Sequence, residues 1–180
     1  MALMHYPVVN KAGDVITAAV TNLDLHDISR AVRTYGVRKF YVITPLSDQQ
    51  ALVGQIVSHW VQGMGATYNP DRREALELIQ VENSIEEVIK KIHITCGERP
   101  KTVATSAKMG PRNIGFHDFR KMLESGAPYI IMLGTAWGLT EEFISSADYV
   151  LQPIQGNTDY NHLSVRSAAA IILDRLLGRD

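Results

Sequence analysis

The sequence predicts an α/β fold in which helices cover both faces of a mostly parallel sheet. Short β-rich runs alternate with helical stretches along the whole chain, which is the pattern of successive βα units. Two of the runs, FYVIT at 40–44 and YIIML at 129–133, are almost continuously apolar rather than alternating. Such runs are typical of strands that are buried on both faces of a sheet.

One domain is expected. The chain has 180 residues, of which 46% are hydrophobic and 21% charged, and a chain of this size can bury a sizeable core. It contains no internal repeat, linker or low-complexity stretch that would divide it. We therefore predict a single domain over residues 1–180.

The β-rich runs and the periodic segments between them give the expected elements. In the first helix, Leu25, Ile28 and Val32 recur on one stripe, as in an amphipathic helix that packs on a core. The expected strands are residues 4–9, 39–44, 76–81, 102–105, 129–133 and 149–151. The expected helices are residues 24–35, 49–62, 85–92, 116–123, a short helix after Thr140, and 165–177.

Three helix starts carry capping signals, and the last helix has a further property. Ser84 with Glu87 has the spacing of a capping box. Thr140 precedes two glutamates, which the helix dipole favours in a first turn, and Ser164 can cap the last helix. RSAAAIILDRLL in that helix is apolar around more than one stripe, which indicates either a core helix or a contribution to a homodimer interface.

The composition predicts a cytoplasmic protein without membrane association. No apolar run approaches the roughly 18–20 residues of a membrane span, and MALMHYPVVN lacks the basic region of an export signal. Cys96 is the only cysteine, so an intrachain disulfide and a multi-cysteine zinc site are excluded. The net charge of −1 lacks the basic footprint of a typical nucleic-acid binder, so an RNA substrate would need a local cluster of cations.

Other enzyme classes lack their motifs. Gly63-Met64-Gly65 is followed by Tyr68 rather than by glycine and comes after a helix, so it is no dinucleotide-binding fingerprint. The chain has neither a P-loop motif nor the G-x-S-x-G of a nucleophile elbow, and Cys96 has no evident partner. The histidines show no metal-ligand spacing, and no metal is expected.

Three segments carry chemistry-bearing residues. In the helix at 24–35, His26, Arg30 and Arg33 share a face nearly opposite the apolar stripe, which is either a solvated basic face or part of a site. In IIMLGTAWGL, at 130–139, two glycines follow a hydrophobic strand, where open α/β sheets bind ligands, although an ordinary βα turn has the same pattern. LQPIQGNTDYNHLSVRSAAA, at 151–170, places many polar side chains before an apolar helix, as a turn or as a site.

Taken together, these segments resemble the SPOUT, or α/β-knot, RNA methyltransferases. That family has a first helix of the form N-x-G-x-x-x-R-x-x-x-x-x-G, a glycine-containing loop after a hydrophobic strand, and a closing segment like I-P-M-x-G…S-L-N-V-S-V-A-A-A-I. Arg30 and Gly36 match the first, LGTAWGL the second, and LQPIQG with NHLSVRSAAAIILDRLL the third. The chain is most similar to a small bacterial branch of unassigned RNA methyltransferases that carries NLDLHDI and YNHLSVRSA.

The resemblance implies a C-terminal trefoil knot, a homodimer that completes the active site, and S-adenosylmethionine bound in the knotted loops, with S-adenosylhomocysteine as its product. The residues that it places at the cofactor are Thr105, Ser106, Leu133, Gly134, Thr135, Gly138, Leu151, Pro153, Ile154, Gly156, Asn161, His162, Leu163 and Ser164.

For catalysis, the resemblance points to the first helix. Arg30 is the family's arginine, and because guanidinium stays protonated, it suits holding a phosphate or stabilising negative charge. His26, one turn earlier, titrates in the useful range and is the candidate base, unless it is a structural histidine. Asp24 is the third candidate catalytic residue. The expected RNA contacts are Arg33, Arg38 and Lys39.

The expected function is S-adenosylmethionine-dependent methylation of tRNA or rRNA. Asp24 and His26 stand where the family pattern has asparagine and glycine, and His162 where it has asparagine. These changes leave the ribose 2′-oxygen and a base nitrogen open as acceptors. The alternative is a non-catalytic module of the same fold that binds S-adenosylmethionine or serves assembly.

Overall fold

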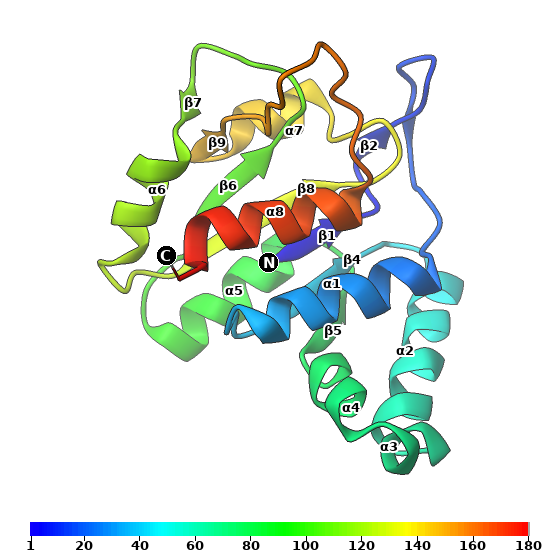
Figure 1. The fold of residues 1–180 in the computed structure, drawn as a ribbon. Coiled ribbons are helices and arrows are strands. Elements are labelled where there is room, and N and C mark those ends of the chain that lie inside the picture. The colour runs from blue at the N-terminus through cyan, green and yellow to red at the C-terminus, as the bar shows by residue number, and fades with distance from the viewer. Residues whose placement is uncertain (180) are drawn as a thin grey trace.

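The computed structural model describes residues 1–179 and places a seven-stranded parallel sheet at the centre of the molecule (Figure 1). The sheet has the order β5-β4-β1-β8-β6-β9-β7, and every pairing in it is parallel, as the sequence predicts. Its strands are β1 (Ala2–Met4), β4 (Phe40–Ile43), β5 (Ile79–Glu82), β6 (Lys101–Thr105), β7 (Asn113–Ile114), β8 (Tyr129–Gly134) and β9 (Tyr149–Leu151). β2 (Val8–Val9) and β3 (Val15–Ile16) form a separate antiparallel hairpin.

Helices cover both faces of this sheet. They are α1 (Asn22–Thr34), α2 (Ser47–Val61), α3 (Met64–Tyr68), α4 (Pro70–Leu76), α5 (Ile85–Cys96), α6 (Phe116–Leu123), α7 (Glu141–Ser146) and α8 (Val165–Leu177). One core cluster joins the sheet to α1, α4, α6 and α8, and a second joins its other face to α5 and α7. No helix within residues 1–179 has both the length and the apolar character needed to cross a bilayer.

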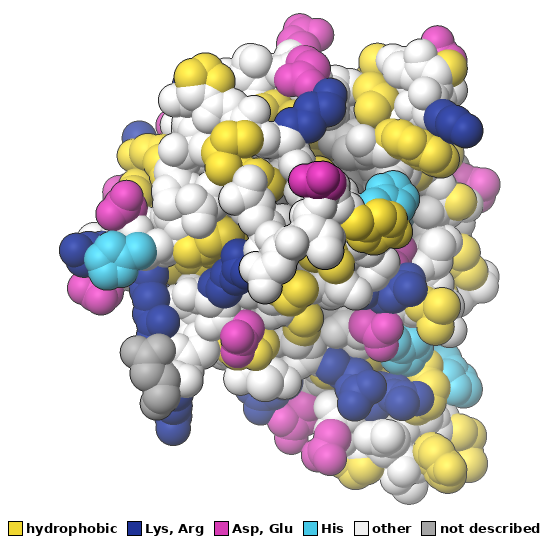
Figure 2. Space-filling model, turned by 45° about the horizontal axis from the view of Figure 1, so that its top comes forward, with side chains coloured by type: hydrophobic (Ala, Val, Ile, Leu, Met, Phe, Trp, Pro, Cys, Tyr) yellow, Lys and Arg dark blue, Asp and Glu magenta, His cyan; other side chains and the backbone are white. Residues whose placement is uncertain are grey.

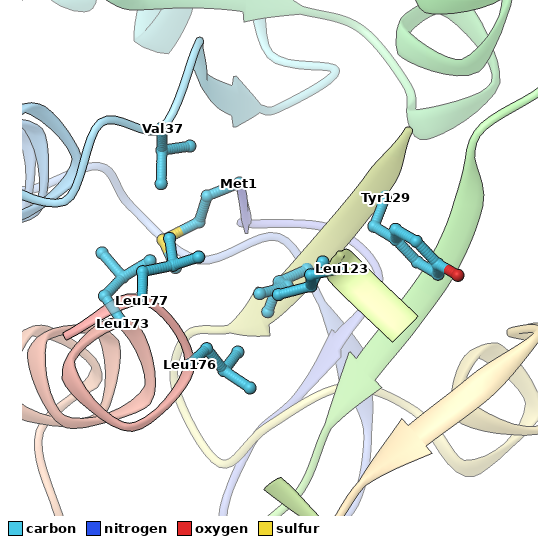
Figure 3. A pocket seen from close by; sticks show the side chains of 8 residues that line it. Met1, Val37, Leu123, Tyr129, Leu173, Leu176 and Leu177 are labelled. Carbon is cyan, nitrogen blue, oxygen red and sulfur yellow. The ribbon is translucent and has the colours of Figure 1, made fainter. Parts of the chain in front are cut away.

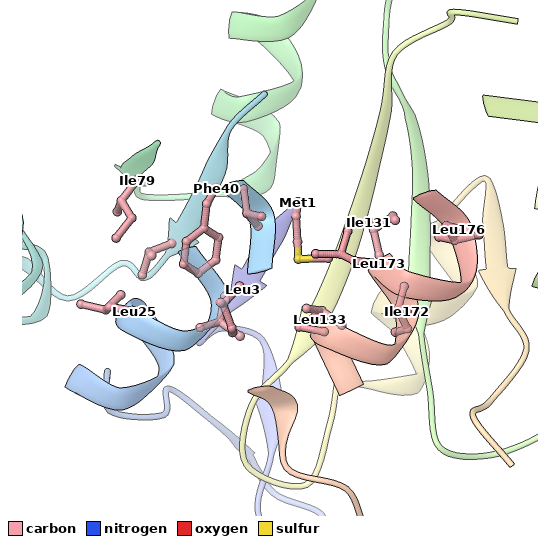
Figure 4. Packing of buried hydrophobic residues seen from close by; sticks show 14 of the residues in the cluster. Met1, Leu3, Leu25, Phe40, Ile79, Ile131, Leu133, Ile172, Leu173 and Leu176 are labelled. Carbon is pink, nitrogen blue, oxygen red and sulfur yellow. The ribbon is translucent and has the colours of Figure 1, made fainter. Parts of the chain in front are cut away.

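Successive strand residues supply the two clusters in turn, which explains the continuous apolar runs. On β1, Leu3 belongs to the first cluster and Met4 to the second. In the first cluster, Ile131 and Leu133 of β8 lie against Leu173 and its neighbours on α8 (Figure 4). The last helix therefore packs on the core along one side.

Two strand predictions are wrong in their bounds. The strand expected at 4–9 is β1, which ends at Met4, because Pro7 has no N–H to donate and residues 8–9 pair instead with the neighbouring hairpin strand. The strand expected at 76–81 begins only at Ile79, since α4 occupies the chain up to Leu76. The Asn69 side chain caps that helix and Pro70 is its first residue, which is a start signal that the sequence does contain.

The structure confirms two of the three capping predictions. Thr140 accepts a hydrogen bond from the Phe143 amide at 3.2 Å, and Ser164 caps α8 in the same way. The Ser84 hydroxyl makes no capping bond, so the predicted capping box is wrong. Glu87 instead accepts a hydrogen bond from the amide of Asn83, at 3.3 Å.

Candidate cofactor and RNA site

The loops that follow β6, β8 and β9 meet at the carboxyl edge of the sheet. These three strands are neighbours in the order β8-β6-β9 and run parallel, so the loops leave the sheet side by side, at the top of Figure 1. The Asn161 amide, in the loop before α8, donates to the carbonyl of Ala107, in the loop after β6, at 2.9 Å. Open α/β sheets bind ligands at this edge.

The loop after β8 is fixed by the first residues of the chain. The backbone N–H and the hydroxyl of Thr135 both donate to the carbonyl of Met4, at 3.2 and 3.0 Å. The amide of Trp137 and the carbonyl of Gly138 bond to the backbone of Val9, each at 3.0 Å. The main-chain groups of this loop are thus largely occupied within the protein, and the loop forms a rigid wall.

Glycine is required at one position of that wall. A Cβ added to Gly134 would lie 2.6 Å from the backbone nitrogen of Leu139 and 2.9 Å from the backbone carbon of Gly138. Both contacts are far below those that real Cβ atoms make, and backbone atoms cannot move aside as a flexible side chain can. The close approach of the strand end to its own loop therefore depends on glycine.

We call the loop after β9, residues 152–164, the closing loop. It surrounds an open cavity of about 550 Å³. That volume is in the range of small-molecule sites. Within the described chain, no backbone N–H from residue 154 to residue 159 donates a hydrogen bond. Such groups need water or a ligand as partners. The residues lining the cavity are Gln155, Gly156, Asn157, Thr158, Asp159 and Asn161.

In this arrangement, backbone groups are better placed than side chains to contact an adenosine-containing cofactor. Leu133 and Leu151 are 2% and 1% exposed and belong to the core, so at a ligand they could offer only main-chain groups. Ile154 is half-buried, and a Cβ on Gly156 would meet open space. Free amide and carbonyl groups are what the polar edge of an adenine ring requires.

The remaining predicted cofactor residues surround the same edge of the sheet. Thr105 donates its hydroxyl to the carbonyl of Met132 at 2.9 Å, and the Ser106 hydroxyl accepts from the amide of Lys108. Pro153 is buried, whereas His162 and Leu163 are exposed in the closing loop. The structure thus brings the predicted cofactor residues to one edge of the sheet, with side chains that differ widely in exposure.

Asp24 joins the first helix to the helix that follows the closing loop. It is 6% exposed, and its carboxylate accepts from the Arg166 guanidinium at 2.9 Å. Arg166 also lies 3.4 Å from the carboxylate of Asp27. His5, buried at the end of β1, has its pKa lowered by burial, although the Asp24 carboxylate opposes this shift. Sequence reasoning missed Arg166, which stands two residues after the cap of α8.

Loss of this ion pair is expected to destabilise the protein. Arg166→Ala leaves the Asp24 carboxylate buried without its cation, and we expect the free energy of unfolding to fall by about 2 kcal/mol, measured by urea denaturation. Asp27→Ala removes the partner whose side chain is 50% exposed, so it serves as the control and should cost less than about 1 kcal/mol. Equal losses for the two variants would contradict this account of the pair.

His26 and Arg33 lie on another face of α1, toward α2 and α4. The His26 ring packs edge-on against Trp60 of α2, with ring centroids 5.3 Å apart. Arg33 is paired with Glu74 of α4 at 2.6 Å. Burial, together with the charges of Arg72 and Arg30, lowers the pKa of His26 against the opposing effect of Asp27. The structure thus brings His26 close to Arg30 and separates both from the Asp24 contact with Arg166.

The Arg30 side chain is exposed, and its charge has no ion-pair partner within residues 1–179. Its side chain makes no ion pair or hydrogen bond within residues 1–179, and its carbonyl accepts from the hydroxyl of Thr34. Arg38 and Lys39 lie elsewhere, in the connection from α1 to β4. That connection enters the sheet at its amino edge, opposite the closing loop, so the structure does not bring these two residues to the cofactor loops.

A second cavity lies at the amino edge of the sheet and has a different character. It measures about 140 Å³, well below the size of small-molecule sites. Figure 3 shows the side chains of α8, β8 and the N-terminus that point into it. Its lining consists of Met1, Val37, Leu123, Tyr129, Ile131, Leu173, Leu176 and Leu177. It is a gap in the core packing rather than a cofactor site.

Comparison with solved structures identifies the fold. A protein described as a probable methyltransferase, from Bordetella pertussis Tohama I, superposes with a TM-score of 0.64 at 16% identity, covering 97% of this chain and 89% of that one. The SpoU methyltransferase AviRb from Streptomyces viridochromogenes, solved with S-adenosylmethionine, gives 0.57 at 16% identity, covering 98% of this chain and 56% of that one. The fold is that of the SPOUT, trefoil-knot methyltransferases, as predicted.

Comparison of sequences gives the family. Residues 1–178 match the family of SAM-dependent RNA methyltransferases, and the chain belongs to it, with S-adenosylmethionine as the family's cofactor. The tRNA (guanine-N(1)-)-methyltransferase of Oleidesulfovibrio alaskensis is 45% identical over 177 residues, covering 98% of this chain and 41% of that protein. The chain therefore spans about two fifths of that relative. An uncharacterized protein of Aquifex aeolicus is 36% identical over 181 residues, covering 100% of this chain and 88% of that protein.

Proposed function

We propose that this chain transfers the methyl group of S-adenosylmethionine to tRNA. One observation carries the proposal: the closing loop of a SAM-dependent RNA methyltransferase surrounds a cavity with unpaired backbone amides, at the ligand-binding edge of the sheet. Relatives named for a tRNA methyltransferase support tRNA over other RNAs. Because they are more than twice as long, their name supports the substrate class and not a particular acceptor atom.

The cofactor supplies a methyl group on a sulfonium, and the chain must position the acceptor and remove its proton. The closing-loop backbone holds the adenosine, and the rigid wall after β8 fixes the orientation of the donor. Arg30 is free to bind a phosphate or to stabilise negative charge on the acceptor. His26, which is neutral at pH 7 because its pKa is lowered, accepts the proton. Asp24 holds Arg166, and with it the helix that follows the closing loop.

A homodimer completes the proposed site. Within one protomer, Asp24 and Arg166 join the sides of α1 and α8 that face one another, while His26 turns toward α2. A second copy would present its α1 to the cofactor of the first. Leu23 on α1 and Leu163 in the closing loop are 61% and 44% exposed, and their contact surface would be buried in such a dimer. The dimer acts in the cytoplasm, where its tRNA substrate is found.

Labelled methyl transfer tests the proposal. The protein is incubated with methyl-labelled S-adenosylmethionine and, separately, with tRNA and rRNA from cells that lack it. We expect label in tRNA and little in rRNA. Bound S-adenosylmethionine without label in either RNA would contradict the proposal and favour a non-catalytic module.

The role of His26 predicts a particular pH dependence. Since burial and the neighbouring arginines lower its pKa below 6.5, His26 remains a neutral base down to a pH lower than an ordinary histidine would. The single-turnover rate should therefore fall only as the pH drops through this lowered pKa, at a lower pH than an ordinary histidine would give. In His26→Gln this acid limb should disappear together with most of the activity. An unchanged acid limb in the variant would exclude His26 as the base.

A further inference from the structure

We propose that the face formed by α1–α4 around Trp60 binds unpaired nucleotides of the RNA substrate. This inference rests on the proposed function, and it concerns a surface on the side of α1 away from Arg166. We call it the Trp60 face, and we define it as Trp60 with His26, Arg30, His59 and Arg72, together with Tyr68 at the end of the adjoining helix α3.

Trp60 organises this face. The Arg72 guanidinium lies over its ring, 4.7 Å from the centroid, and the His59 and His26 rings approach it edge-on, each with 5.3 Å between centroids. The indole thereby gathers side chains from α1, α2 and α4. α3 packs tightly against the indole at Gly65. A Cβ added there would lie 2.7 Å from the Cε3 atom of Trp60. Four helices thus fix the position of one arginine and two histidines.

The two arginines of this face have no acidic ion-pair partner in the described residues. Within residues 1–179, neither Arg30 nor Arg72 makes an ion pair through its side chain, whereas Arg33 and Arg73 on the same helices are paired with Glu74 and Glu77. The Nε atom of Arg72 is buried without a hydrogen-bond partner. Lys, Arg and His side chains gather over this part of the molecule, at the lower right of Figure 2. In a chain with a net charge of −1, this is a local site for anions.

The face also carries an exposed aromatic ring. Tyr68, at the end of α3, is 86% exposed, and Met64 in the same helix is 81% exposed. Trp60 is half-buried and covered by Arg72, so Tyr68 is the ring that a base can stack on. Proteins bind unpaired RNA bases by combining stacking on aromatic side chains with cations that hold the phosphates. The charge complementarity to phosphate selects RNA over a protein as the occupant.

Two substitutions with matched controls test the face. Arg72→Gln removes the free cation, and Arg73→Gln, one residue later, makes the same charge change where the guanidinium is already paired. Tyr68→Ala removes the stacking ring and Tyr68→Phe retains it. We expect KM for tRNA to rise about tenfold in Arg72→Gln and in Tyr68→Ala, with unchanged affinity for S-adenosylmethionine in both. The kcat should stay unchanged in Tyr68→Ala, whereas Arg72→Gln also removes a charge that lowers the pKa of His26. Arg73→Gln and Tyr68→Phe should stay within about twofold of the unaltered protein.

The salt dependence of tRNA binding gives an independent readout. Arg72→Gln should reduce the slope of log K against log salt by about one unit, as expected when one phosphate contact is lost, and Arg73→Gln should leave it unchanged. Tyr68 is almost fully exposed, so Tyr68→Ala remains informative even if Arg72→Gln disturbs packing at Trp60.

The outcomes separate this inference from the proposed function. Wild-type tRNA affinity and salt slope in both Tyr68→Ala and Arg72→Gln would overturn the inference, whether or not methyl transfer occurs. Weaker tRNA binding in both, in a protein that transfers no methyl group, would support the face and contradict the proposed function. Equal losses in Arg72→Gln and Arg73→Gln would also overturn the inference, because the effect would then follow charge in general.

Discussion

Arg30→Ala is expected to lower the rate of methyl transfer to tRNA by at least about a hundredfold, the size of loss seen when a charge-stabilising donor is removed from an active site. Arg30 is exposed on α1, one helical turn after His26. Its guanidinium, without a protein partner in the described residues, can hold a phosphate or the developing charge of the acceptor. Single-turnover kinetics with labelled S-adenosylmethionine measures the rate, and calorimetry should show unchanged cofactor affinity.

The control for this experiment lies one helical turn along. Arg33→Ala removes the same side chain from a position where Glu74 already neutralises it, and the rate should fall by no more than about threefold. A wild-type rate in Arg30→Ala would refute the catalytic role of Arg30. Comparable losses of rate in Arg30→Ala and Arg33→Ala would mean that α1 supports methyl transfer only through its overall positive charge.

Gly134→Val is expected to abolish binding of S-adenosylmethionine, as measured by calorimetry. The new Cβ would lie 2.6 Å from the nitrogen of Leu139, so the loop after β8 must leave its position. That loop is fixed to the first residues of the chain by the backbone bonds of Thr135 and Trp137, and it cannot shift without breaking them. The wall of the cofactor site would then be displaced.

Gly54 provides the matched control for that substitution. A Cβ there would meet nothing within 4 Å, so Gly54→Val on α2 should bind S-adenosylmethionine normally. Thermal unfolding of both variants separates a displaced loop from a general loss of the fold. Normal cofactor affinity in a folded Gly134→Val protein would show that the loop after β8 takes no part in the site.

Much of this fold is predictable from the sequence, because the strand and cap patterns involve residues that are close together along the chain. Both faces of the sheet are covered, so the strands FYVI and YIIMLG have almost no polar positions, and they are recognisable without any knowledge of their partners. Caps such as Thr140 and Ser164 act within one helical turn and can be predicted for the same reason. The order of the strands and the knotted path depend on contacts between distant segments, and only the family resemblance indicated the knot.

The sequence proposes candidate site residues, but it does not show which face of the first helix each residue occupies. The motifs identify the closing loop and Arg30, but periodicity alone cannot say that His26 packs against Trp60, 34 positions further along the chain. Nor can it place Asp24 against Arg166 of the last helix. The helix at 24–35 has three occupied faces instead of one apolar and one solvated face, because α2–α4 and α8 both pack on it.

Nucleoside analysis of tRNA from living cells tests the central claim most directly. Total tRNA is digested to nucleosides from cells with the protein, cells without it, and deleted cells that express either the unaltered protein or Arg30→Ala. We predict that one methylated nucleoside is lost on deletion, is restored by the unaltered protein, and is not restored by Arg30→Ala. Identical tRNA nucleosides in all four samples would contradict the account.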